Sequence, residues 1–267
     1  GGVDGQIVLT SKDRMKLFNL LSKYNIKYIR PRPAKRVYIP KKDGKMRPLG
    51  IPIIKDRVFQ NVVKNSLEPQ WEARFEPSTY GFRPKRSGQD AIVNLFTKLS
   101  SRSTRKWIFE GDFKGCFDNL NHKYIMDCLI DFPAKDAIQK WLEAGFVDND
   151  SFHDTDSGTP QGGIVSPLLA NIALHGMEEE IGVSYYIDRE YHKLARKSVG
   201  VVKYADDFVI VCKTKEEAMS MYEKLNPYLN KRGLTLAENK TKVTHIEKGF
   251  DFLGFNLRQY KSNKGMT

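Results

Sequence analysis

The run Tyr204-Ala205-Asp206-Asp207-Phe208 places two adjacent carboxylates between two apolar, β-prone segments, residues 199–204 and 208–212. An ordinary two-residue hairpin turn favours Asn-Gly or Asp-Gly, because its central residues take positive φ. Two neighbouring aspartates instead repel each other, and a divalent cation would offset that repulsion directly. The run therefore predicts a hairpin whose tip carries a charged site.

A third carboxylate ends another apolar run. The segment Trp107-Ile108-Phe109-Glu110-Gly111-Asp112 predicts a strand that finishes at Asp112. Three aspartates from two strand ends can hold two magnesium ions, which prefer carboxylate oxygens together with substrate phosphates. Such a pair of ions stabilises the attacking and leaving oxygens of a phosphoryl transfer. An Asp-Asp pair alone is more often an exposed turn, and it is the third aspartate that favours a metal site.

The charge of the chain is unevenly distributed. Residues 1–100 hold 21 Lys and Arg against 8 Asp and Glu, whereas the other residues of the 267 hold 23 against 24. A basic surplus of this kind indicates a polyanionic partner such as nucleic acid. The alternative is a basic surface that only keeps the protein soluble.

Composition excludes several other classes of protein. With 40% hydrophobic and 28% charged residues, the chain is neither disordered nor fibrous. No window approaches 18 apolar residues, and no signal peptide is recognised, so we expect no membrane association. Three scattered cysteines suit neither a disulfide framework nor a zinc site. The expected location is cytoplasmic, meaning an intracellular compartment of bacterial or organellar type.

The remaining pattern alternates helices with strands, which predicts an α+β fold in which helices cover a sheet. An Asp43-Gly44 pair predicts a hairpin between residues 37–40 and 47–52. Further strands are expected near residues 234–236, 242–246 and 250–257. Helices are expected at residues 11–23, 55–75, 87–99, 122–130, 134–144, 166–180 and 215–231.

An ordered series of motifs across nearly the whole chain resembles that of reverse transcriptases. The run Tyr204-Ala205-Asp206-Asp207 matches the active-site block of that family. The set as a whole resembles group II intron-encoded maturase reverse transcriptases, with retron-type relatives as a less favoured alternative. The other matching blocks are Arg47-Pro48-Leu49-Gly50-Ile51-Pro52, Tyr80-Gly81-Phe82-Arg83-Pro84, residues 112–119, residues 158–163 with 166–171, residues 234–242 and residues 250–255.

This resemblance implies a right-hand polymerase with fingers and a palm, the palm carrying a ferredoxin-like antiparallel sheet with helices. Residues 1–105 would be mainly basic fingers, and residues 106–267 mainly palm, with part of residues 120–170 returning to the fingers. The family has a helical thumb after the last block, so this chain would be a fingers–palm fragment that lacks the thumb and part of the N-terminus.

The resemblance also implies roles for the acidic residues. Asp112, Asp206 and Asp207 would be catalytic, and together with the backbone carbonyl of Phe113 they would hold two Mg²⁺ ions per site. Adjacent side chains of an extended chain point to opposite sides, so Asp207 would touch metal less directly than Asp206.

Four further residues would bind the incoming nucleotide. Lys41 and Arg47 flank the predicted hairpin and would grip the triphosphate, with Lys42 and Lys45 competing for that role. Phe117 occupies the position of the family's steric gate, where an aromatic ring would clash with a 2′-hydroxyl. Gln161 would line the nucleotide pocket. The plainer alternatives are solvated turn lysines and a core phenylalanine.

Six residues would contact the template or primer, since aromatic and basic side chains stack bases and neutralise phosphates. A purely structural role is the alternative for each. They are Arg30, Arg36, Tyr80, Arg83, Lys240 and Lys242.

The implied function is RNA-directed DNA polymerase activity within a group II intron maturase that also binds intron RNA to aid splicing and mobility. The partners would be an RNA template and intron RNA, a DNA or RNA primer, and deoxynucleoside triphosphates, with a homodimer left open. A second hypothesis is an RNA-binding splicing cofactor with little polymerase activity in this fragment. A weaker third is an RNA-directed RNA polymerase, which Phe117 and the Tyr-Ala-Asp-Asp form disfavour.

Overall fold

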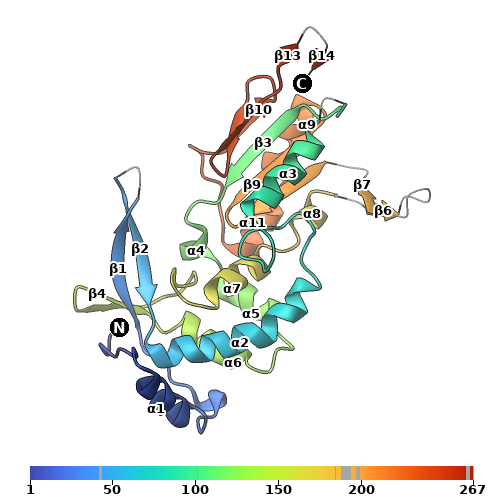
Figure 1. Cartoon of the computed structure of the whole chain (residues 1–267). Coiled ribbons are helices and arrows are strands. Elements are labelled where there is room, and N and C mark those ends of the chain that lie inside the picture. The colour runs from blue at the N-terminus through green and yellow to red at the C-terminus, as the bar shows by residue number, and fades with distance from the viewer. Residues whose placement is uncertain are drawn as a thin grey trace. The chain divides into compact units, whose positions relative to one another are not determined.

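The structure is a computed structural model of the chain, and it describes residues 1–41, 44–100, 102–183, 185–187, 194–196, 199–262 and 265–266. The chain divides into two units (Figure 1). Unit 1 comprises residues 1–74 and 117–173, and unit 2 comprises residues 75–116 and 174–267. Each unit is therefore assembled from two separate stretches of sequence.

Unit 1 combines a small sheet with several helices. Its sheet has the order β2-β1-β4-β5, with β1 antiparallel to β2 and parallel to β4. The predicted hairpin is confirmed as β1 and β2. The strands are β1 (Ala34–Pro40), β2 (Met46–Ile51), β4 (Phe146–Asp148) and β5 (Ser151–His153). The helices are α1 (Ser11–Leu21), η1 (Ile26–Tyr28), α2 (Ile54–Glu72), α5 (His122–Cys128), α6 (Lys135–Leu142) and α7 (Ser166–Ala173), and α4 (Cys116–Asn119) spans the unit boundary.

Unit 2 is organised by an antiparallel sheet of the order β10-β3-β9-β8. These strands are β3 (Trp107–Asp112), β8 (Gly200–Tyr204), β9 (Asp207–Cys212) and β10 (Lys242–His245). If the four strands are numbered 1 to 4 by their order along the chain, their order across the sheet is 4-1-3-2. This is the ferredoxin-like arrangement, and it confirms the predicted α+β sheet. The smaller strands are β6 (Tyr185–Ile187), β7 (Leu194–Arg196), β11 (Phe250–Phe252), β12 (Phe255–Leu257), β13 (Lys261–Ser262) and β14 (Gly265–Met266), and the helices are α3 (Gly88–Lys98), α8 (Met177–Glu180), α9 (Lys215–Met219), α10 (Met221–Lys224) and α11 (Asn226–Arg232).

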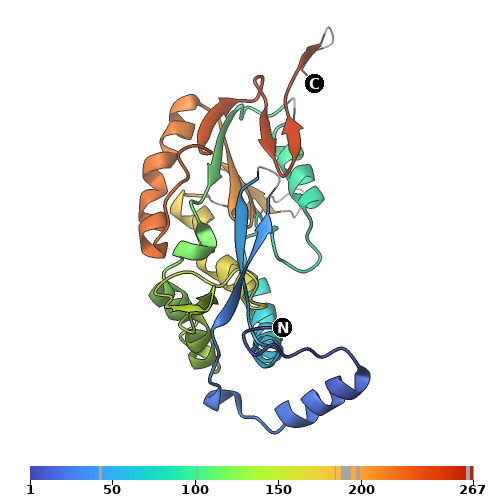
Figure 2. The ribbon, with the colours of Figure 1, turned by 90° about the vertical axis from the view of Figure 1, so that its left-hand side faces the viewer.

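Helices cover both faces of this sheet (Figure 2). Successive strand residues point to opposite faces, so Ile108 packs toward α3 while Phe109 packs toward α10, where its ring centroid lies 4.9 Å from that of Tyr222. Both faces are apolar, as expected for a strand buried on two sides. The core on the α3 face includes Ala91, Leu95, Leu99, Ile108, Val202, Val209, Val211 and Ile246.

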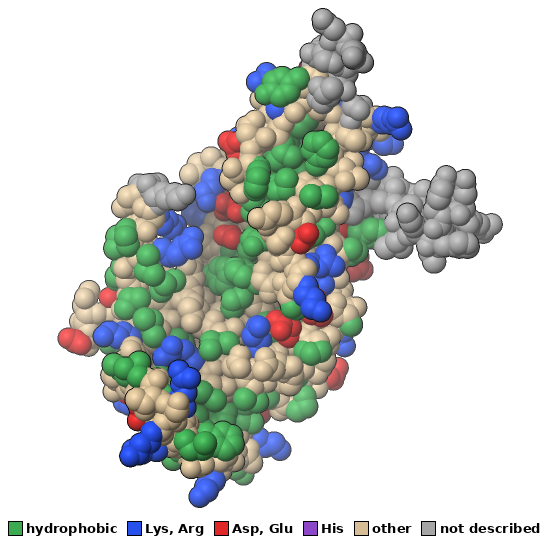
Figure 3. Space-filling model, in the orientation of Figure 1, with side chains coloured by type: hydrophobic (Ala, Val, Ile, Leu, Met, Phe, Trp, Pro, Cys, Tyr) green, Lys and Arg blue, Asp and Glu red, His purple; other side chains and the backbone are tan. Residues whose placement is uncertain are grey.

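Hydrophobic side chains also gather on the outer face of α3 (Figure 3). Val93 and Phe96 are 65% and 71% exposed, and Phe255 of β12 is 48% exposed. These side chains take no part in packing α3 onto the sheet. Exposed apolar groups gathered in this way are typical of a surface that contacts other molecules.

Several predicted elements differ from those observed. The helix predicted at residues 166–180 is broken into α7 and α8, because Gly176 takes φ +92° between them. The helix predicted at residues 215–231 is divided into α9, α10 and α11, and Gly233 ends it with φ +70°. The strand predicted at residues 250–257 is the hairpin β11–β12, and residues 234–236 contribute only a bridge between Leu236 and Phe113. Strands β4 and β5 were not predicted.

A substitution at Gly111 tests how tightly β3 packs against the ring of Phe208. A Cβ at Gly111 would lie 2.2 Å from Cζ of Phe208, whose buried ring packs against Phe109 and Phe113. We expect Gly111→Ala to lower the free energy of unfolding by about 1–3 kcal/mol. Gly88→Ala is the control, because its Cβ would meet nothing closer than 3.6 Å at the start of α3. Thermal unfolding of both variants measures the difference, and equal melting temperatures would contradict the packing argument.

Candidate active site

The tip of the β8–β9 hairpin carries the aspartate pair. Tyr204 ends β8 and pairs with Asp207, the first residue of β9, so that Ala205 and Asp206 form the turn. The predicted hairpin is thus confirmed. Ala205 is buried and takes φ +55°. A non-glycine residue in this region costs on the order of 1 kcal/mol, so the surrounding structure holds the turn in place.

Asp112 lies opposite Asp207 in the antiparallel register of β3 and β9. Directly opposed residues share one face of a sheet, and Asp112 is only 8% exposed. Burial, helped by the nearby charges of Asp206 and Asp112 and opposed by Lys240, raises the pKa of Asp207 to about 6. The structure therefore brings the three predicted aspartates into one electrostatic cluster.

Lys240 partly balances this negative charge. Its Nζ lies 2.5 Å from Oδ2 of Asp112, and this hydrogen bond raises the pKa of the lysine. Nζ of Lys242 on β10 lies 3.4 Å from Oε2 of Glu110, the residue opposite it on β3. Both lysines remain more than half exposed, so their predicted contact with template or primer stays a prediction. Asp112, Asp207 and Lys240 line one pocket of unit 2, whose full lining is Glu110, Gly111, Asp112, Asp207, Phe208, Val209, Lys240, Asp251 and Phe252.

The donor set fits a magnesium ion in type and charge. Carboxylate oxygens are the protein ligands that Mg²⁺ prefers, and the pKa of Asp207 is raised first by burial and then by the negative charges of Asp206 and Asp112. Over the described part of the chain, no three His, Cys, Asp or Glu side chains form a ready-made metal cluster. Asp112 is paired with Lys240 instead. A cation that binds Oδ2 of Asp112 would thus replace the ammonium group of Lys240 there.

Phe113 contributes a buried ring next to Asp112. The ring is 1% exposed, and its centroid lies 5.0 Å from that of Phe208 and 6.4 Å from that of Tyr228. Backbone bonds from Lys114 N to Thr235 O and from Ala237 N to Asp112 O fix the chain on either side of Phe113. Neither bond uses the Phe113 carbonyl, whose role as a metal ligand stays a prediction.

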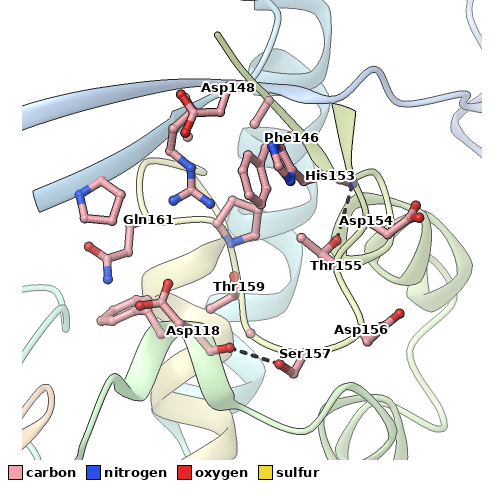
Figure 4. A pocket seen from close by; sticks show the side chains of 18 of the residues that line it. Asp118, Phe146, Asp148, His153, Asp154, Thr155, Asp156, Ser157, Thr159 and Gln161 are labelled. Atoms are coloured by element: carbon pink, nitrogen blue, oxygen red, sulfur yellow. Dashed lines mark hydrogen bonds between the residues drawn. The ribbon is translucent and has the colours of Figure 1, made fainter. Parts of the chain in front are cut away.

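Phe117 and Gln161 line one pocket of unit 1 (Figure 4). Thr159 N donates to Phe117 O and Gly50 N donates to Gln161 O, both at 2.6 Å, so backbone bonds anchor residues 159–161 to α4 and β2. The guanidinium of Arg36 enters the same pocket, 3.7 Å above the centroid of the Phe146 ring. The pocket also contains residues that were not predicted: Tyr38, Asp118, Phe146, Asp148, His153, Asp154, Asp156 and Thr159.

The other basic residues predicted to bind nucleotide or RNA in unit 1 are at the surface. Lys41 and Arg47 are exposed on the β1–β2 hairpin, where Lys41 N donates to Lys45 O across the turn. Arg30 is exposed before β1. Lys42, the competing candidate, lies outside the described residues, as does Asp43 of the predicted turn pair. The contacts of Lys41, Arg47 and Arg30 with nucleotide or RNA stay predictions.

Tyr80 and Arg83, whose contact with template or primer stays a prediction, differ from the other candidates in their exposure. Both side chains are buried, at 6% and 7% exposure. Nη1 of Arg83 donates to the carbonyls of Glu76 and Thr79 at 3.1 and 2.9 Å. These side chains stabilise their own loop. Glu76 and Lys203 form a buried ion pair at 3.0 Å that was not predicted. The lysine inside the apolar run Val201-Val202-Lys203-Tyr204 was the one signal in the sequence for half of this pair.

Comparison with known proteins identifies the family. Residues 39–257 match the family model described as reverse transcriptase (RNA-dependent DNA polymerase). The chain belongs to the reverse transcriptase family. It is 33% identical to protein YkfC of Escherichia coli over 99% of this chain and 77% of YkfC. It is 36% identical to the group II intron-encoded protein LtrA of Lactococcus lactis, over 87% of this chain and 48% of LtrA.

The family resemblance predicted from the motifs is therefore confirmed, and the chain is a reverse transcriptase domain related to group II intron-encoded proteins. It is also 28% identical to maturase-like protein 1 of Euglena longa, of which it spans 53%. Among solved structures it resembles a telomerase from Candida albicans, with a TM-score of 0.62 and 14% identity over 94% of this chain and 50% of that one. At this identity the likeness shows the fold alone. The chain spans about half the length of several of these relatives.

Among the residues that the structure describes, no helix combines the length and the apolar character needed to cross a membrane.

The raised pKa of Asp207 predicts a pH-dependent stability. Between the ordinary value of 3.8 and the folded value of about 6, the folded state binds more protons than the unfolded state, so stability falls as pH rises through this window. Asp207→Asn removes that cost. In the absence of divalent cations we expect the variant to be more stable than the parent by about 1–3 kcal/mol near pH 8, with the gain vanishing toward about pH 4.

Denaturant unfolding across this pH range, with a chelator present, measures the effect. Asp251→Asn is the control, because Asp251 lines the same pocket but is exposed. Its stability should change by less than about 0.5 kcal/mol. A gain for Asp207→Asn that persists unchanged at acid pH would show that the carboxylate cluster is not its cause.

Proposed function

We propose that this chain is the RNA-directed DNA polymerase domain of a group II intron maturase. The observation that carries the proposal is the pairing of Asp112 with Asp207 across β3 and β9, with Asp206 in the adjoining turn. The kinship with LtrA, a group II intron-encoded protein, supports the intron assignment. Residues 1–105 would be mainly fingers and residues 106–267 mainly palm, with part of residues 120–170 returning to the fingers.

In this proposal Asp112, Asp206 and Asp207, with the Phe113 carbonyl, hold two Mg²⁺ ions. When bound, these ions supply positive charge to the attacking and leaving oxygens of nucleotidyl transfer. The primer 3′-oxygen forms a bond to the α-phosphorus of a deoxynucleotide, the bond to the bridging oxygen breaks, and pyrophosphate leaves. The aspartates are fixed by the sheet, so they need little reorganisation during the reaction. The family and its fold generally use divalent metal ions, which supports this assignment.

Residues of unit 1 would select and hold the nucleotide. Lys41 and Arg47 would pair with the triphosphate, where charge-assisted bonds are strong. Phe117 would lie beneath the sugar, and Gln161, which lines the same pocket, would contact the nucleotide. Arg30 and Arg36 would contact the RNA template, with Lys240 and Lys242 near the primer. The RNA partner is supported by the solved telomerase complex with a telomeric RNA fragment, a protein of the same fold.

A second function, as an RNA-binding splicing cofactor, is favoured by a separate observation. The basic surplus lies within residues 1–100, and Arg30, Lys41 and Arg47 are exposed there. Binding through such residues would depend steeply on salt, because phosphate contacts release counterions. It would not need the aspartates, so substitutions can separate the two functions.

Asp206→Ala separates polymerase activity from RNA binding. We expect primer extension on an annealed RNA template to fall by more than about 1,000-fold, since the substitution removes a ligand for the catalytic cations. RNA affinity at equal salt should change less than about threefold. Arg47→Ala is the complementary variant and should weaken RNA or nucleotide binding while leaving the aspartates intact.

Primer extension and filter binding on the same samples make this comparison. Extension that survives Asp206→Ala would refute the assigned site. Tight, salt-dependent RNA binding without any extension by the parent chain would favour the splicing-cofactor function.

Phe117→Ala tests selection of the sugar. Removing a ring from beneath the ribose should raise the efficiency of ribonucleotide incorporation relative to deoxynucleotides by about 10–100-fold, because the clash with the 2′-hydroxyl disappears. Phe152→Ala is the control, since Phe152 is exposed on β5 and does not line the pocket. Steady-state kcat/KM for matched ribo- and deoxynucleotides provides the ratio. An unchanged ratio would leave Phe117 as a packing residue.

A further inference from the structure

A short segment, residues 76–83, covers the outer edge of β8 immediately before the aspartate turn. Lys203 N donates to Ser78 O at 2.9 Å, and Tyr80 N donates to Lys203 O at 2.8 Å. Thr79 and Lys203 form a parallel bridge. The segment therefore occupies the hydrogen-bonding groups of Lys203, which precedes Tyr204 and the turn. All of these residues belong to unit 2.

The same segment is attached to β8 by a buried ion pair. Nζ of Lys203 lies 3.0 Å from Oε2 of Glu76 and donates to Leu174 O at 2.5 Å. Oε1 of Glu76 accepts from Glu178 N at 2.8 Å. Lys203 is 1% exposed and Glu76 8%. Losing either partner leaves an uncompensated buried charge, whereas the intact pair adds little net stability. What the pair provides is a fixed position for β8 relative to the segment.

Gly81 brings the segment directly against the turn. A Cβ at Gly81 would lie 2.3 Å from Ala205 N and 3.0 Å from both Ala205 Cα and Tyr204 C. All three are backbone atoms, which cannot swing aside as the end of a side chain can. Glycine at this position thus permits a close approach that any other residue would prevent. The atoms approached belong to the strained residue of the turn and to its neighbour.

Internal bonds make the segment rigid enough to act as a support. Nη1 of Arg83 donates to the carbonyls of Glu76 and Thr79, and Nη1 of Arg86 donates to Pro77 O at 2.8 Å. The Tyr80 side chain packs in the core beside α3. The aromatic and basic side chains at positions 80 and 83, predicted to contact RNA, are used to hold this segment together.

We infer that residues 76–83 position the catalytic turn, with Glu76, Lys203 and Gly81 as positioning residues that place Asp206 and Asp207 relative to Asp112. This inference rests on the proposed function only in assigning catalysis to the turn. Second-layer residues of this kind commonly change metal affinity or activity by 10–100-fold without touching metal or substrate.

Three variants test the inference, with one control. Gly81→Ala adds a methyl group against the turn, Lys203→Met removes the buried ammonium, and Glu76→Gln keeps the shape and the acceptor for Glu178 N. The control, Leu229→Ala, leaves a cavity where the buried side chain of Leu229 packs. Leu229 lies in α11, is 4% exposed and is distant from the turn in sequence. Its melting temperature should fall by about as much as that of the ion-pair variants.

The first readout needs no catalysis. Mn²⁺ binding, followed by the loss of the free-ion electron paramagnetic resonance signal, should weaken by about 10-fold in Gly81→Ala and the two ion-pair variants. Hydrogen exchange of the amides at residues 203–207 should accelerate at least as much. Leu229→Ala should leave Mn²⁺ affinity within about twofold at a temperature where it is folded.

The second readout is primer extension. The kcat should fall by about 100-fold, because a misplacement of the catalytic groups by about 1 Å reduces the rate by that factor. The nucleotide KM should change by less than about threefold. Normal Mn²⁺ affinity and normal exchange in folded variants would overturn the inference, as would equal losses in Leu229→Ala. If Gly81→Ala does not fold, Glu76→Gln and Lys203→Met decide the result. If the parent chain extends no primer, the proposed function is refuted. The Mn²⁺ affinity and the amide hydrogen exchange of the variants still test whether residues 76–83 position the turn.

Discussion

The antiparallel pairing of β3 with β9 is the constraint on which the site depends. It sets Asp112 opposite Asp207, and because side chains alternate with a period of two, a slip of one residue would send one carboxylate to the opposite face. The register is fixed by packing far from the charges. Ile108 and Val211 lie on the α3 face, whereas Phe109 and Phe208 lie on the other. Apolar packing on both faces thus determines where the acidic groups meet.

Gathering these carboxylates opposes stability, and the fold contains features that limit the cost. Burial and neighbouring charges raise the pKa of Asp207 to about 6, and Lys240 neutralises part of the charge at Asp112. The positive φ of Ala205 adds local strain. Strain and like charge at one turn persist only where the surrounding contacts outweigh them, which is typical of sites arranged for chemistry rather than stability.

Local patterns predicted much of the sheet and of the aspartate cluster, since β3, β8 and β9 are short apolar runs whose ends are marked by charged residues. What they could not predict depends on contacts distant in sequence. Glu76 and Lys203 are 127 residues apart, and no period relates them. Strands β4 and β5 are three residues each, too short to show a period of two, and they form because β4 finds a partner in β1. The break between α7 and α8 required knowing that Gly176 adopts a left-handed conformation.

The loop around Gly81 shows why composition alone does not determine how the side chains of such a motif are used. Tyrosine with arginine is typical of nucleic-acid contact when the side chains are exposed, but the same residues serve as internal donors and packing groups when buried. Exposure decides between these roles, and Tyr80 and Arg83 are buried. Gly81 adds an independent constraint, since its position against Ala205 is steric and excludes any side chain there. A segment held by its own arginine and by a buried ion pair has the rigidity that support of a strained turn demands.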